Sequence, residues 1–186
     1  MRGRTKLVLA VAALVVTALA VTSFAVAGGG SGKGKSDDHG KSSTFGARLS
    51  GYNETPSLNS TGHATFTLTI QNDTMTFKLD YADLSGPPAV AHVHIGQVGV
   101  AGAVSFFLCG GSTKPPCPAS PSGSVSGTVA AADIIGPTTQ GFNPGDIASV
   151  IAAIQHGVAY ANMHTAKFPA GEIRGQLVPT GHHFGH

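Results

Sequence analysis

Two histidines separated by a single residue, His92 and His94, are the side chains of this sequence best suited to chemistry. They stand in residues 91–96, AHVHIG, where they alternate with small or β-branched apolar residues. Successive side chains of a strand point to opposite faces of the sheet. Both imidazoles are therefore predicted on one face, with the apolar residues facing a core. Neutral imidazole is a common protein ligand for zinc and copper.

A second alternating segment, residues 158–165, supplies a third imidazole, His164, on the face opposite its apolar residues. If the two segments are neighbouring strands, His92, His94 and His164 converge. Three histidines with an open fourth position suit zinc or copper, so these residues are candidate metal ligands. The alternative is that they are surface histidines that hydrogen-bond to neighbouring groups.

A few polar residues are candidates for supporting roles around these histidines. Tyr160, Asn162 and Glu172 are placed to orient the imidazole rings as outer-shell groups. Glu172 and Arg174 are two residues apart, so they are expected on one strand face, where a cross-strand ion pair is the default. Glu54, in an earlier loop, is a further candidate partner of Arg174. No nucleophile motif, phosphate-binding loop or glycosidase acid pair can be singled out, so no catalytic residue is predicted.

Short alternating segments separated by turn residues must position these side chains. The pattern predicts strands over residues 45–50, 62–70, 75–81, 91–95, 104–108, 124–130, 158–165 and 171–178. One short amphipathic helix is expected between an N-cap at Asn143 and a C′ residue at Gly157, with apolar residues every three to four positions. The predicted fold is all-β, an antiparallel Greek-key-like β-sandwich with one short amphipathic helix.

The N-terminus has the order of a secretory signal peptide. Three basic residues precede an apolar run over residues 7–21, and Ala25-Val26-Ala27 offers an A-x-A cleavage site, which favours a signal over residues 1–27 against an uncleaved anchor. Residues 28–43 are predicted to be a flexible Gly/Ser/Lys linker, 44–179 the β-sandwich domain, and 180–186 a His-rich disordered tail. The protein is thus expected to be secreted, extracellular or in the cell envelope, with no stable membrane span after cleavage.

The charge of the chain excludes one class of partner, and its cysteine content agrees with an exported protein. Of eleven Lys and Arg residues three belong to the predicted signal, which leaves eight against nine acidic residues, so nucleic-acid binding is not expected. The two cysteines, Cys109 and Cys117, are predicted to form a disulfide. Metal binding by their thiolates is the alternative, but no Cys-x-x-Cys spacing supports it.

Four stretches of the sequence carry a family resemblance: residues 49–56, 91–96 with Gly99 and Gly102, 160–165 and 169–177. Taken together they resemble the CHRD domain, a module named after chordin that also occurs in secreted bacterial proteins. The resemblance implies an all-β sandwich in an extracellular setting, and it carries no settled biochemical activity. A looser likeness to copper/zinc superoxide dismutase is confined to His92, Val93 and His94.

Three functions are compatible with these observations. The first is a non-catalytic secreted module that binds an extracellular protein or a cell-envelope component. The second is a copper- or zinc-binding protein that uses His92, His94 and His164. The third, a metal-dependent redox enzyme of the dismutase type, has the least support, because the sequence offers no counterpart to the bridging histidine and zinc cluster of that family.

Overall fold

The computed structural model describes residues 42–181, and nine strands and one α-helix make up half of this part. The predicted signal peptide, most of the predicted linker and the last five residues of the predicted tail lie outside it. Short 3-10 helices occupy Gly51–Asn53, Ala131–Asp133 and Thr138–Gln140. The main elements are β1 Ser43–Ser50, β2 His63–Gln71, β3 Thr74–Ala82, β4 Pro88–Ile95, β5 Ala103–Cys109, β6 Gly123–Val129, α1 Ile147–Gln155, β7 Ala159–Thr165, β8 Ile173–Gln176 and β9 Val178–Pro179.

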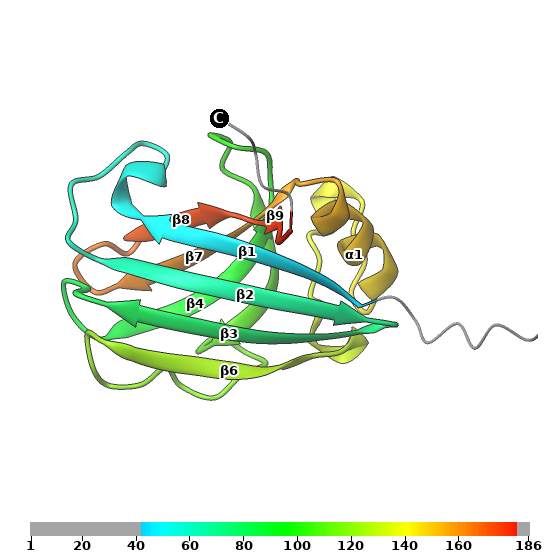
Figure 1. Ribbon diagram of the computed structural model, residues 1–186, viewed down its shortest axis with the longest axis horizontal. Coiled ribbons are helices and arrows are strands. Elements are labelled where there is room, and N and C mark those ends of the chain that lie inside the picture. The colour runs from blue at the N-terminus through cyan, green and yellow to red at the C-terminus, as the bar shows by residue number, and fades with distance from the viewer. Residues whose placement is uncertain (1–41, 182–186) are drawn as a thin grey trace, which may run out of the picture. The chain divides into compact units, whose positions relative to one another are not determined.

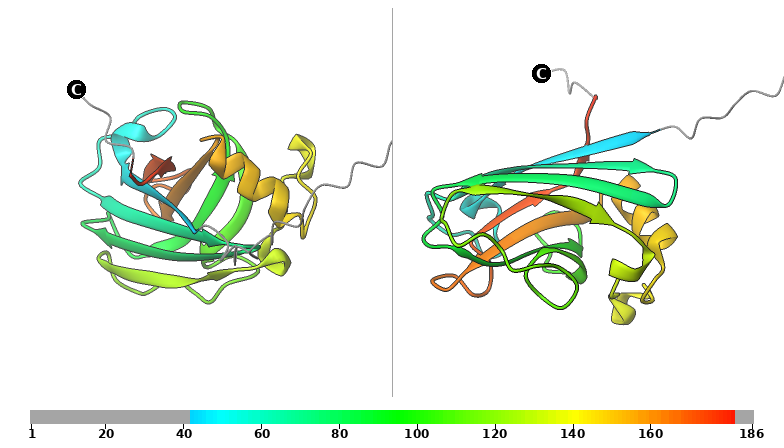
Figure 2. Two further views of the ribbon diagram at one scale, coloured as in Figure 1. Left: turned by 45° about the vertical axis from the view of Figure 1, so that its right-hand side comes forward. Right: turned by 90° about the horizontal axis from the view of Figure 1, so that it is seen from below.

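The strands form one antiparallel sheet that folds over itself and nearly closes. Its order is β5-β4-β7-β8-β1-β2-β3-β6, with β9 paired to β1, and the end strands β5 and β6 contact each other. Figure 1 shows β1, β2, β3 and β6 as the layer in front of β4 and β7, and the second view in Figure 2 shows the two layers edge-on. The all-β, antiparallel, two-layered architecture expected from the sequence is confirmed.

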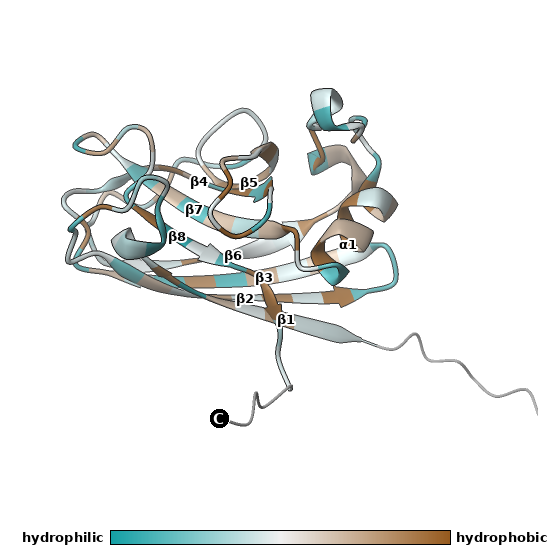
Figure 3. Ribbon diagram, turned by 90° about the horizontal axis from the view of Figure 1, so that it is seen from above, coloured by the Kyte–Doolittle hydropathy of each residue, from teal (hydrophilic) through white to brown (hydrophobic). Residues whose placement is uncertain are grey.

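The front layer is built on the hairpin of β2 and β3, whose alternation faces one set of side chains inward. Phe66 pairs with Leu79 and Leu68 with Phe77 across the hairpin, and all four are buried. Asn72 adopts a positive φ of 53° in the turn, a conformation that asparagine tolerates better than most residues. Figure 3 shows the resulting alternation of hydrophobic and hydrophilic bands along these strands.

The rear layer contributes the apolar residues predicted to face the core. Ala91, Val93, Ala161 and Met163 are all fully buried. Strands β4 and β7 are direct neighbours, which satisfies the condition set by the sequence for bringing the histidines together. Because the apolar residues face the interior, the intervening polar residues of both strands lie on the outer face of this layer.

Helix α1 closes one end of the folded sheet (Figures 1 and 2) and starts later than the sequence suggests. The N-cap is Asp146, whose Oδ1 accepts a hydrogen bond from the Ser149 amide at 3.1 Å, and not Asn143. Asn143 belongs to the preceding turn, where its carbonyl accepts from the Asp146 amide. The predicted end is correct, since Gly157 follows the helix with a φ of 71°.

The disulfide expected from the sequence is present in the described residues. Cys109 and Cys117 form it, with their Cα atoms 4.9 Å apart. Between residues 42 and 181 the structure has no helix with the length and apolarity needed to span a membrane.

Candidate functional site

The three histidines meet on the outer face of the rear layer. In the β4–β7 register, His92 lies opposite Asn162 and His94 opposite Tyr160. His164 lies opposite Val90, two residues before His92 on β4. The ring of His92 is the centre of the group, with its centroid 4.4 Å from that of His94 and 4.6 Å from that of His164. The alternation that assigned all three to one face thus also places them side by side.

The nitrogens of these rings approach a metal-binding arrangement. One ring nitrogen from each of His92, His94 and His164 lies within 4.8 Å of the corresponding nitrogen of the other two. In a tetrahedral site with zinc–nitrogen bonds of 2.0–2.1 Å, the nitrogens are about 3.4 Å apart. A bound ion would therefore draw the rings together by up to about 1.4 Å.

Backbone carbonyls fix the orientation of two of the rings. Nδ1 of His94 is 2.9 Å from the Gly102 carbonyl oxygen, and Nδ1 of His164 is 3.0 Å from that of Pro169. Since a carbonyl only accepts, each Nδ1 carries the proton and each Nε2 holds a lone pair. This second hydrogen bond is the support that metal-binding histidines usually have.

Three buried nitrogens remain without a hydrogen-bond partner among the described residues: Nδ1 of His92, Nε2 of His94 and Nε2 of His164. Burial lowers the pKa of His92 to about 3, helped by the neighbouring His94 and His164. Burial also lowers the pKa of His94 to about 4, although its bond to Gly102 opposes the shift. Burial lowers the pKa of His164 as well. At neutral pH all three imidazoles are therefore uncharged, the form that binds a metal.

Gly102 lets the loop after β4 return closely enough to reach His94. A Cβ at this position would overlap the carbonyl of Ile95, so only glycine permits the approach. The close approach at Gly102 therefore brings its carbonyl within hydrogen-bond distance of the His94 imidazole.

Tyr160, one of the residues expected near the histidines, supports His94 directly. Its ring stacks on the His94 ring with centroids 4.6 Å apart and planes 6° from parallel. The Arg174 guanidinium carbon lies 3.5 Å from the centre of the same ring. Because β7 runs between β4 and β8, the tyrosine separates His94 from the arginine.

Asn162 does not hydrogen-bond to an imidazole, although it lies across from His92. Its Nδ2 donates to Oε1 of Glu54 at 2.6 Å and to the Ile173 carbonyl at 2.9 Å. Gly171, with a φ of 128°, passes so close that a Cβ there would lie 2.8 Å from the same carboxylate oxygen. Asn162 therefore anchors the loop that carries Glu54 to the sheet.

The ion pairs expected for Arg174 are wrong. Within residues 42–181 no carboxylate lies within 4.0 Å of its guanidinium, which donates instead to the carbonyls of Gln97 and Val100, at 3.0 and 2.9 Å, and to Thr55 Oγ1 at 3.3 Å. Glu54 is committed to Asn162 and feels Arg174 only through its charge.

Glu172 is also placed differently from the sequence expectation, because it precedes β8 and is fully buried. Its carboxylate accepts hydrogen bonds from the hydroxyls of Ser60, Ser85 and Thr165 at 2.6–2.7 Å and from the Ser85 amide at 2.8 Å. Burial raises its pKa, but these bonds outweigh that effect and the pKa is lowered. Glu172 is thus a buried anion that ties three segments together, not a ligand-orienting group.

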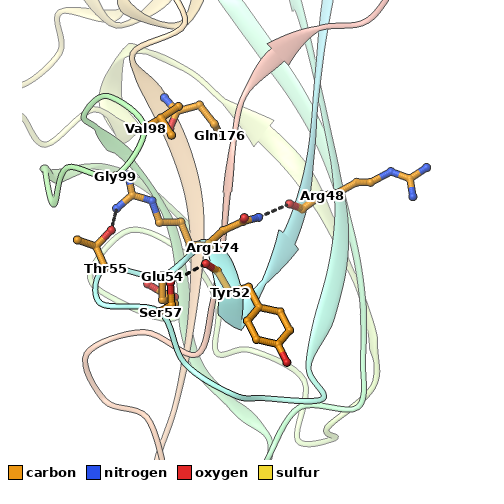
Figure 4. Close-up of a pocket in the computed structure, with 10 residues that line it drawn as sticks. Arg48, Tyr52, Glu54, Thr55, Ser57, Val98, Gly99, Arg174 and Gln176 are labelled. Carbon is orange, nitrogen blue, oxygen red and sulfur yellow. Dashed lines mark hydrogen bonds between the residues drawn. The ribbon is translucent and has the colours of Figure 1, made fainter. Parts of the chain in front are cut away.

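An open cavity of about 440 Å³ lies next to Arg174, between the 52–57 loop and the 97–100 loop (Figure 4). Arg174 lines it, and a dashed line in Figure 4 marks its bond to Thr55. This cavity could not be predicted from the sequence, because its walls come from segments more than forty residues apart in the chain.

Comparison with known proteins supports the family assignment. The CHRD domain family model matches residues 45–177, nearly the whole of the described part of the chain. Searches of curated proteins and of solved structures returned no match. The family match covers more than half of the chain and includes the three histidines, Tyr160, Asn162 and Arg174. The chain belongs to the CHRD domain family.

Proposed function

We propose that this CHRD domain binds one zinc or copper ion through His92, His94 and His164. The observation that carries the proposal is the convergence of three imidazoles, with one ring nitrogen of each within 4.8 Å of the other two. Each ring also has one buried nitrogen without a hydrogen-bond partner in residues 42–181. A buried polar atom left unsatisfied costs about 1–3 kcal/mol, and coordination of a metal ion would remove such a cost.

The chemistry of the three side chains fits the ion. All are neutral at pH 7, so no proton has to be displaced before the metal binds. Two have their second nitrogen fixed by a backbone carbonyl, which reduces the ordering cost. Three nitrogen ligands leave a fourth position for water or a partner group, as in sites of three histidines generally.

We place this binding function in an exported protein. The signal-like N-terminus and the Cys109–Cys117 disulfide support that setting. The proposal is one of binding: the ion supplies the domain with a coordination site for an extracellular or envelope component. Dismutase-type turnover would need copper-dependent activity that disappears when the three histidines are replaced.

The test uses the full chain with the tail histidines His182, His183 and His186 changed to alanine, since they offer competing imidazoles. The protein is stripped with chelator, loaded with Zn²⁺ or Cu²⁺, dialysed and analysed for metal by mass spectrometry. We expect one ion per chain, and none after His92, His94 and His164 are also replaced by alanine.

The matched control is His63→Ala, which removes an exposed histidine of β2 outside the cluster. It should leave the stoichiometry unchanged. Retention of no ion by the parent protein, or of the same ion by the triple variant, would overturn the proposal.

A further inference from the structure

Arg174 is a buried cation without a direct ion pair. The residue is 3% exposed, and no carboxylate of residues 42–181 lies within 4.0 Å of its guanidinium. Glu54 acts on it only through its charge, and the Tyr160 ring covers one face of the guanidinium. Buried charges in proteins are normally paired directly, because leaving one unpaired is costly. A carboxylate from outside the described chain would supply that direct pair.

The guanidinium retains donors for such an anion. Its bonds to Gln97, Val100 and Thr55 use three of the five N–H groups that an arginine carries. The remaining two have no partner in the described part of the molecule. Because Arg174 lines the 440 Å³ cavity, a ligand entering there would meet it.

The other charges of the cavity favour a monoanion. Arg48 and Arg174 are opposed by a single acid, Glu54, so the lining carries a net charge of one positive unit when all three are ionised. A carboxylate would balance that charge, whereas a phosphate dianion would exceed it and be repelled by Glu54. Burial raises the pKa of Glu54, although Asn162 and Arg174 oppose the shift.

The rest of the lining favours a ligand rich in hydroxyl groups. The cavity is far larger than a carboxylate, and its walls are mainly planar or hydroxyl-bearing polar side chains. Hydroxyl groups both donate and accept, so they match this mixture of arginine donors, a carboxylate and amides. Tyr52, 69% exposed at the rim, offers an aromatic face for the C–H surface of a sugar ring.

We propose that this cavity binds an acidic saccharide, with the carboxylate at Arg174 and the sugar hydroxyls at Glu54 and Asn53. The site is distinct from the histidine cluster, because the Tyr160 ring stands between Arg174 and His94. Arg174 nevertheless acts on His94 through its charge, so binding is measured both with and without metal. A uronic-acid unit of a polysaccharide has the required combination of one carboxylate and several hydroxyls.

The test is a titration of the full chain, in metal-free and zinc-loaded forms, with glucuronate and galacturonate, glucose, acetate and inorganic phosphate, followed by amide NMR shifts. We expect a uronate to bind at least tenfold more tightly than glucose or acetate, with shifts at Tyr52 and Val98. Arg174→Lys should weaken uronate binding at least tenfold, because lysine cannot offer the planar fork. The matched control Lys78→Gln removes an exposed cation of β3 and should change nothing.

Arg174 also joins two loops, so a second pair of variants keeps the proposal testable if Arg174→Lys does not fold. Glu54→Gln should strengthen uronate binding and Arg48→Gln should weaken it, each severalfold, since they change the cavity charge in opposite directions. Equal binding of glucuronate and glucose, tighter binding of phosphate, or no shift at the cavity with either uronate would overturn the proposal.

Discussion

Lowering the pH is expected to destabilise the metal-free protein through His92 and His94. Their pKa values are about 3 and about 4 in the folded protein, against 6.5 for an ordinary histidine. At a pH between these values and 6.5, the two histidines therefore bind protons in the unfolded chain but not in the folded chain. The stability that these groups contribute is fully present above pH 6.5 and is lost as the pH falls toward the folded pKa values.

The size of the loss at pH 5 follows from these values. At that pH the unfolded histidines are almost fully protonated and the folded ones are not, so each group lowers the free energy of unfolding by about 2 kcal/mol relative to high pH. Raising the folded pKa of His92 from 3 to 4 would hardly change this result, because pH 5 lies above both. Together the two groups account for about 4 kcal/mol.

The assay is urea denaturation with chelator present at pH 7, 6 and 5. Wild type should lose about 2 kcal/mol more between pH 7 and pH 5 than His92→Asn, which has one of the two titrating groups removed. His63→Asn, which changes an exposed histidine, should follow wild type. Other acids titrate equally in all three proteins, so they cancel in the comparison. An equal loss in wild type and His92→Asn would refute the burial and neutrality assigned to His92.

Three further outcomes are expected. Glu172→Gln should lower the free energy of unfolding by about 2–3 kcal/mol in urea denaturation, because an amide N–H₂ would face hydroxyl donors in a fully buried site; a change near zero would contradict the account of that anion. Replacing Cys109 and Cys117 by alanine opens a loop with a sequence separation of eight and should cost about 2–3 kcal/mol, measured in the same way; unchanged stability would show that the loop is held by other contacts. Zinc at one hundred times its dissociation constant should stabilise wild type by about 2.7 kcal/mol in a thermal shift assay. His164→Ala should show no such gain, and an equal gain would exclude His164 as a ligand.

Strand alternation was sufficient to predict the shared face of the histidines. A period of two is a local property, and the apolar residues on either side of His92, His94 and His164 fixed which way each imidazole pointed. The convergence of the three histidines also required β4 and β7 to be neighbouring strands, and the sequence alone could not show that they are. The structure meets this requirement, since these strands are paired along their whole length.

Long-range partners were beyond the reach of the sequence. Glu172 collects its donors from Ser60, Ser85 and Thr165, and the first of these lies 112 residues away. No periodicity links such positions. The sequence instead suggested cross-strand ion pairing on the strand face shared by Glu172 and Arg174. The structure gives Glu172 hydroxyl and amide donors, and it gives Arg174 two loop carbonyls and the Thr55 hydroxyl.

The loop carbonyls that orient the imidazoles could not be predicted from the sequence either. The carbonyls of Gly102 and Pro169 hold the imidazoles of His94 and His164, but every residue has a carbonyl, so the sequence could not mark these two. The start of α1 shows the same limit on a smaller scale. Asn143 and Asp146 are both residue types that favour the N-cap, and the structure uses the second, directly after Gly145 with its positive φ of 82°.

The most direct test of the metal site is anomalous diffraction from crystals of the zinc-loaded protein, collected above and below the zinc absorption edge. One anomalous peak is predicted on the outer face of β4 and β7, with a nitrogen of His92, His94 and His164 each about 2.0–2.1 Å away. The rings of His94 and His164 should keep their Nδ1 bonds to Gly102 and Pro169. A zinc-loaded crystal with no peak among these three imidazoles would contradict the central claim.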